Sequence, residues 1–130
     1  MDHRADVGVR VRGETLEELF AEAARAMSFV ISERAPEGWP QSHRVELDAP
    51  DTEQLLVDWL SELLYLFEVK KFYAQEAEIE SIDANRLAAT VRGVQMKGVF
   101  PCAEIKAVTQ HLLSIDRTLE GFETVVYFDL

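Results

Sequence analysis

The opening residues alternate between apolar and polar positions, which is typical of a half-buried β-strand. Val7, Val9 and Val11 share one face with Ala5, whereas Asp6, Gly8, Arg10 and Arg12 share the other. The alternation predicts a strand over residues 3–12 that ends at Gly13. Because the pattern is already under way at the first residues, we expect a short segment to precede the numbered chain.

Two later segments have apolar residues at helical spacing. Thr15 stands three residues before Glu18, as in a helix N-terminal capping box, and apolar positions recur from Leu16 to Ile31. Phe29 alone falls on the polar side of this helix, where we expect it to reach a second element or a partner. Asp51, followed by Gln54, predicts the start of a longer helix that reaches Phe67.

The longer helix is apolar over more than half of its circumference, so we expect other elements to cover it on more than one side. Trp59 is predicted to be a packing residue at the centre of the core. Between the two helices, residues 32–41 predict a loop in which Trp39 covers a core edge, and residues 43–49 predict a strand that ends at Pro50.

From Phe72 onward the apolar period changes to two. The segments 76–80 and 87–91 predict a hairpin that turns at residues 83–85, and residues 93–101 predict a loop. Two further strands are expected at 104–115 and 124–129. This order of elements predicts one α+β domain over residues 1–130, a two-layer sandwich with two helices packed on a mainly antiparallel sheet.

The chain carries a formal net charge of −11, which repels phosphate backbones. We therefore expect no direct nucleic-acid partner; cations or a protein with a basic face suit the surface better, although acidity also serves solubility. No apolar run approaches the about 20 residues of a membrane span, and no secretory signal is recognisable. A cytoplasmic location is expected, with no membrane partner.

Several kinds of catalytic or binding site are poorly supported. Cys102 is the single cysteine, which excludes an internal disulfide and a thiolate zinc cluster. His3, His43 and His111 lack the spacing of a zinc motif, so His3 and His111 remain secondary candidates that only the fold can bring to a site. No glycine-rich phosphate loop is present, and no nucleophile with its base is evident.

The end of the chain has a more specific pattern. Asp129 and the terminal carboxylate of Leu130 close an apolar strand, and two adjacent anions at a core edge need a counter-charge unless the end frays into water. Asp6 in the first strand would complete an oxygen-only set for a divalent cation. Calcium is expected, with magnesium or manganese as alternatives, and Lys106 could neutralise the same acids without a metal.

Asp58 and Glu62 lie one helical turn apart on the polar strip of the longer helix. They form either a solvated face or a second place for a cation or a basic partner.

Five ordered blocks of the sequence resemble the archease family. They are the opening motif Asp2-His3-Arg4-Ala5-Asp6-Val7-Gly8, the helix start at residues 13–20, the central helix at 55–67, the late strand at 104–111 and the ending Phe128-Asp129-Leu130. Arg4 stands where the family usually has threonine, and the loop at 93–102 lacks an acidic residue and a histidine common in that region.

The resemblance implies a metal-binding accessory protein that activates an RtcB-type RNA ligase in tRNA splicing and RNA repair. Such a protein promotes guanylylation of the ligase and multiple turnover, and it has no catalytic activity of its own. Family residues linked to metal binding and activation correspond to Asp6, Lys106 and Asp129. The alternative is a general chaperone or protein-interaction module, for which Phe29 and Trp39 would supply apolar contacts.

Overall fold

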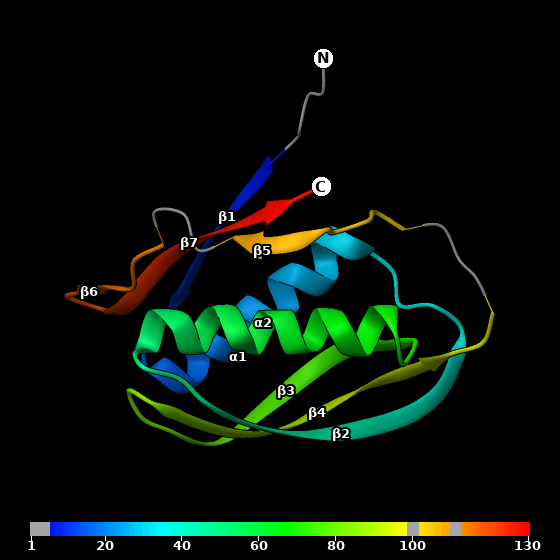
Figure 1. Ribbon diagram of the computed structural model, residues 1–130, viewed down its shortest axis with the longest axis horizontal. Helices are drawn as coiled ribbons and strands as arrows, with labels where there is room; N and C mark the ends of the chain where they lie inside the picture. Colours follow the sequence, from blue (N-terminus) through cyan, green and yellow to red (C-terminus); the bar gives the residue numbers. More distant parts are fainter. Residues whose placement is uncertain (1–5, 99–101, 110–112) are drawn as a thin grey trace.

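Two helices and a set of antiparallel strands make up the computed structural model, which describes residues 6–98, 102–109 and 113–130 (Figure 1). The elements in chain order are β1 (Asp6–Gly13), α1 (Leu16–Ile31), β2 (Gly38–Asp48), α2 (Thr52–Glu68), β3 (Phe72–Ile82), β4 (Arg86–Met96), β5 (Ala107–Thr109), β6 (Asp116–Thr118) and β7 (Gly121–Asp129). The predicted α+β class, with two helices and antiparallel pairing, is confirmed.

The described strands form two sheets. One has the order β1-β7-β5, with β6 also paired to β7, and the other has the order β2-β4-β3. Figure 1 shows α2 between them, and each helix contacts strands of both sheets. This arrangement explains the wide apolar arc of α2, because a helix covered from both sides must be apolar on both sides. Neither helix has the length and hydropathy that a membrane span requires, within the described residues.

Both predicted helix starts are confirmed. The Thr15 hydroxyl accepts a hydrogen bond from the Glu18 N–H at 3.1 Å, and the Asp51 carboxylate accepts one from the Gln54 N–H at 2.8 Å. Each bond satisfies an N–H group in the first turn that has no partner inside the helix. Local sequence therefore determines where both helices begin.

Trp59 lies at the centre of the core, as predicted, with no exposed surface. Its indole N–H donates to the Phe20 carbonyl of α1 at 2.9 Å, so the side chain joins the two helices by packing and by one hydrogen bond. Phe20 and Leu60 are equally buried beside it in the same cluster.

The predicted loops at 32–41 and 93–101 are partly strand, which corrects two boundaries. β2 already begins at Gly38 and β4 continues to Met96, so Trp39 pairs with Gln95. Pro40 does not prevent this pairing, because β2 is an edge strand and proline is tolerated at a sheet edge. Trp39 is 58% exposed and does not cover a core edge as expected.

The strand expected over 104–115 is shorter in the structure. Only Ala107–Thr109 forms β5, and residues 110–112 lie outside the described part of the chain. The polar connection that follows contains β6, which forms a hairpin with the start of β7. These short strands depend on pairing with β7, which the local sequence of each does not specify.

Tyr73 closes the end of α1 from β3. Its hydroxyl is placed to donate to the carbonyls of Ser28 and Ser32, at 3.2 and 2.7 Å, and burial raises the pKa of its phenol. Tyr73→Phe is expected to lower the free energy of unfolding by about 1 kcal/mol, because buried helix-end carbonyls lose a donor. Urea unfolding would measure this, and an unchanged midpoint would show that the hydroxyl contributes nothing.

Candidate functional site

Asp6 and Asp129 lie directly opposite each other at one end of the β1-β7-β5 sheet. They are paired residues in the antiparallel register of β1 and β7, whose adjoining ends lie side by side in Figure 1. Directly opposed residues project on the same face of a sheet, with Cβ atoms about 4.5–5.5 Å apart. The fold therefore brings together two acids from opposite ends of the sequence.

Lys106 immediately precedes β5 and reaches the same strand end through its backbone. Its backbone N–H donates to the Asp129 carbonyl at 2.7 Å, and the next residue, Ala107, pairs with Asp129. The side chain of Lys106 is exposed. The backbones of Asp6, Lys106 and Asp129 thus meet at the end of β7, where Leu130 follows directly, and the residue directly opposite Asp129 on this side is Ala107.

On the outer face of the sheet, the pair next to the two aspartates is Gly8 and Tyr127, because the intervening pair of Val7 and Phe128 belongs to the opposite face. A Cβ at Gly8 would lie 2.7 Å from the Tyr127 ring, so the glycine leaves room for the ring to lie against the strand. Tyr127 was not predicted from the sequence to be part of this surface. The available signal was a glycine at an outward position of the first strand.

Other residues considered from the sequence do not join this group. His3 and His111 lie outside the described residues. His43 lies in the other sheet, on β2, where its ring packs edge-on against Phe72 and its Nε2 atom is buried without a hydrogen-bond partner. Asp58 on α2 accepts a hydrogen bond from the Gln54 side chain at 2.7 Å, which favours a structural role for this acid.

The paired aspartates fit a hard divalent cation as an incomplete ligand set. Opposed like charges on neighbouring strands are destabilising, and a shared cation would remove the repulsion. Two carboxylates fill only part of a calcium or magnesium shell, so other positions remain for water, phosphate or a partner. Within the described ranges, no group of three or more His, Cys, Asp or Glu side chains is placed to hold a metal, so these two carboxylates do not form a complete metal centre there.

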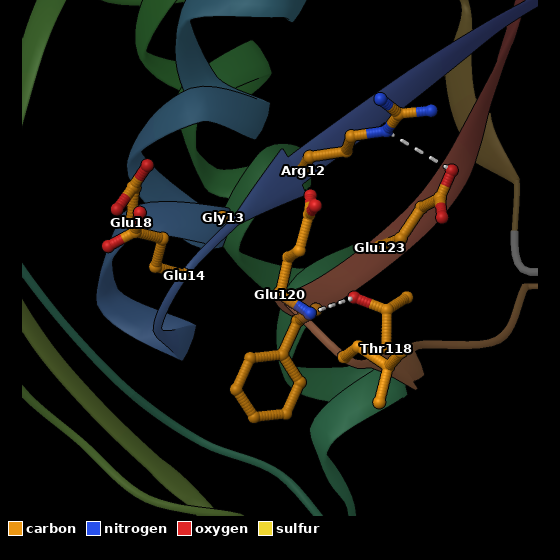
Figure 2. Close-up of a pocket in the computed structure, with 9 residues that line it drawn as sticks. Arg12, Gly13, Glu14, Glu18, Thr118, Glu120 and Glu123 are labelled. Carbon is orange, nitrogen blue, oxygen red and sulfur yellow. Dashed lines mark hydrogen bonds and ion pairs between the residues drawn. The ribbon is translucent and has the colours of Figure 1, made fainter.

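A separate depression of about 610 Å³ lies at the opposite end of β1 (Figure 2). It is bordered by Glu14, Glu18 and Glu120, and Arg12 contacts Glu123 there at 3.4 Å. A hydrogen bond from Arg10 lowers the pKa of the Glu123 carboxyl below its ordinary value. Arg10 and Arg12 form ion pairs with Glu123 on this exposed surface, and the paired aspartates lie at the other end of β1.

Comparison with known proteins gives a consistent family assignment. The sequence model of the archease protein family (MTH1598/TM1083) matches residues 1–130. The chain is 37% identical to protein archease of Methanosarcina barkeri, over 100% of this chain and 93% of the relative. It is 33% identical to protein archease of Archaeoglobus fulgidus, over 100% of this chain and 96% of the relative.

Two solved structures have the same fold. The crystal structure of an archease, possible chaperone, from Thermotoga maritima superposes with a TM-score of 0.71 at 25% identity, over 100% of this chain and 94% of that chain. The solution structure of Methanobacterium thermoautotrophicum protein 1598 gives 0.69 at 28% identity, over 100% of this chain and 96% of that chain.

Proposed function

This chain belongs to the archease family, and we propose that it is a non-enzymatic, metal-binding activator of an RtcB-type RNA ligase in tRNA splicing and RNA repair. The single observation that carries the proposal is the register of Asp6 opposite Asp129, with Lys106 bound to the same strand end. We expect this end of the sheet to dock at the nucleotide site of the ligase and to promote guanylylation of its active-site histidine and multiple turnover.

The chemistry of nucleotidyl transfer explains why the aspartate end of the sheet would promote guanylylation of the ligase. The reaction depends on placing the phosphates and neutralising their charge, and a divalent cation at the aspartates, calcium or otherwise magnesium or manganese, supplies that charge when bound. Asp6 and Asp129 hold the cation with oxygens, whereas Lys106 adds a positive group beside them. Main-chain pairing of β1 with β7 fixes Asp6 and Asp129, and one backbone hydrogen bond holds Lys106 to the Asp129 carbonyl.

A guanylylation assay tests this role directly. The wild-type protein is expected to accelerate GMP transfer to its cognate ligase in the presence of GTP and calcium or magnesium, whereas Asp129→Ala is expected to lose the stimulation. Even residues one step removed from a metal contribute about 10–100-fold to its affinity, so loss of a direct carboxylate should have at least that effect.

Glu33→Gln is the matched control, because Glu33 is an exposed acid in the connection between α1 and β2. It is expected to stimulate the ligase as well as the wild type does. Full stimulation by Asp129→Ala, or unchanged guanylylation with the wild-type protein, would contradict the proposed function.

A second candidate function is a general chaperone or protein-interaction module. It is favoured by the exposure of two large apolar side chains, Phe29 at 61% and Trp39 at 58%, and by the description of the Thermotoga maritima relative as a possible chaperone. Suppression of aggregation of unrelated proteins that is unaffected by Asp6→Asn, together with no effect on the ligase, would favour this function.

A further inference from the structure

An open groove runs between β1 and α1 and is separate from the aspartate pair. The β1–α1 groove has a volume of about 570 Å³. It is lined by residues 9–12 of β1 and by Glu22, Arg25, Ala26, Phe29 and Val30 of α1. The helical residues recur at intervals of three and four, so they come from one face of α1.

β1 presents an edge in this groove. In the described part of the chain β1 is the last strand of its sheet, with β7 as its neighbour on the other side. Four consecutive β1 residues line the groove, which means that the strand faces it edge-on. The edge of a strand offers N–H and C=O groups to which an extended peptide can add as a further strand, as PDZ and PTB domains do.

The α1 side of the groove supplies apolar contact. Phe29 is 61% exposed although it is a large aromatic residue, and Ala26 and Val30 are next to it on the helix. Val9 and Val11 belong to the face of β1 that is directed at the core. An added strand would therefore place alternate side chains against Phe29 and the apolar face of β1, which predicts an apolar residue at every second position.

The opposite face of β1 supplies positive charge. Arg10 and Arg12 project outward there, with side chains 60% and 72% exposed, and Arg25 on α1 is 65% exposed. Arg10 and Arg12 form ion pairs with Glu123 of β7, and Arg25 forms one with Glu22 on the same helix, yet all three arginine side chains remain largely exposed. Three accessible arginines in one groove contrast with a net charge of −11 for the whole chain.

We propose that the β1–α1 groove binds an extended segment of a partner protein in which apolar residues alternate with acidic ones, and that this segment pairs with β1. Acidic side chains of the segment would lie opposite Arg10 and Arg12 as cross-strand pairs. A second copy of the chain suits the groove less well. Two chains that each have a net charge of −11 repel each other, and the β1 strand of the second copy would add two arginines to the three already in the groove. Binding at this groove is independent of the ligase-activator role.

A labelled synthetic peptide of alternating valine and glutamate, matched to the eight residues of β1, provides the probe. Fluorescence anisotropy is expected to show saturable binding at neutral pH, with no binding of a valine-lysine peptide. Phe29→Ala is expected to weaken binding about tenfold, as loss of an aromatic anchor does. The double variant Arg10→Ala, Arg12→Ala should weaken it and reduce its salt dependence.

Two matched controls are available on other surfaces. Leu119→Ala removes an exposed apolar side chain from the β6–β7 turn, and Arg86→Ala with Arg92→Ala removes two exposed arginines from the other sheet. Both controls are expected to bind the peptide like the wild type. Circular dichroism would confirm that every variant is folded.

Amide hydrogen exchange locates the bound peptide, which should protect β1 amides that are not bonded to β7. Protection of β1 together with loss of binding in the Phe29 variant would support the proposal. Absence of peptide binding, binding as tight as that of the wild type in both the Phe29 and the arginine variants, or a concentration-dependent dimer that protects β1 without peptide would each overturn it.

Discussion

In the absence of divalent cations, Asp6→Asn is expected to be more stable than the wild-type protein, and the order is expected to reverse in saturating calcium. Asp6 and Asp129 are direct cross-strand partners, and removing one of two opposed like charges should stabilise the sheet by about 0.2–1 kcal/mol. A ligand at about one hundred times its dissociation constant stabilises the folded state by about 2.7 kcal/mol, and the variant should lose most of this gain.

Thermal unfolding with and without a chelator measures both effects in one protein. For a domain of this size, about 1 kcal/mol corresponds to a shift in Tm of roughly 4 °C, so both differences are measurable. Glu33→Gln is again the control and should respond to calcium like the wild type. An equal calcium-induced shift in Asp6→Asn and wild type would show that the aspartates do not share a cation.

The stability of Asp6→Asn in chelator also tests whether the Asp6 carboxylate has a stabilising partner in the absence of metal. If Asp6→Asn is less stable than wild type without metal, the Asp6 carboxylate already has a stabilising partner, such as Lys106. That outcome would contradict the repulsion expected from the register and would favour neutralisation by lysine as the resting state of the site.

Trp59→Ala is expected to lower the free energy of unfolding by about 3–5 kcal/mol, because it leaves a large cavity between two helices that are covered by sheets. Trp59 is fully buried and binds the Phe20 carbonyl, so packing and a hydrogen bond are lost together. Small domains have a total stability of only about 5–15 kcal/mol, so this variant should be marginally folded at room temperature.

Trp59→Phe separates the two contributions. It retains most of the apolar volume and is expected to cost about 1–2 kcal/mol, mainly through the lost hydrogen bond and a smaller cavity. Trp39→Ala is the matched control, because that indole is mostly exposed and its loss should change stability by no more than about 0.5 kcal/mol. Urea unfolding would give all three values, and a loss below about 1 kcal/mol in Trp59→Ala would contradict a central packing role.

Features that depend on neighbouring residues were predicted correctly from the sequence. The caps at Thr15 and Asp51 form because their side chains reach N–H groups only three residues away. The apolar spacing of α1 and α2 is set by the geometry of the helix, so the class of the fold and the central position of Trp59 followed from the pattern.

Strand limits were predicted less well, because pairing decides them. Residues 38–42 contain the turn-forming Gly38 and Pro40, yet they are extended because β4 lies beside them. Conversely, among the described residues after Glu104 the strand is Ala107–Thr109, which begins where β7 ends at Asp129. Phe29 was expected to reach a second element or a partner, and Trp39 to cover a core edge; both side chains are mostly exposed in the structure.

The sequence by itself determined the two helices, the apolar core and the acidic side chains near the two ends of the chain. The tertiary structure decided which of these side chains meet, because β1 and β7 are distant in sequence and only their antiparallel register places Asp6 opposite Asp129. Among the described strands, the same pairing leaves β1 with an unpaired edge beside Phe29. The physical reason is range, since a helix is stabilised by contacts within a few residues, whereas a sheet joins segments whose spacing along the chain contains no information about their register.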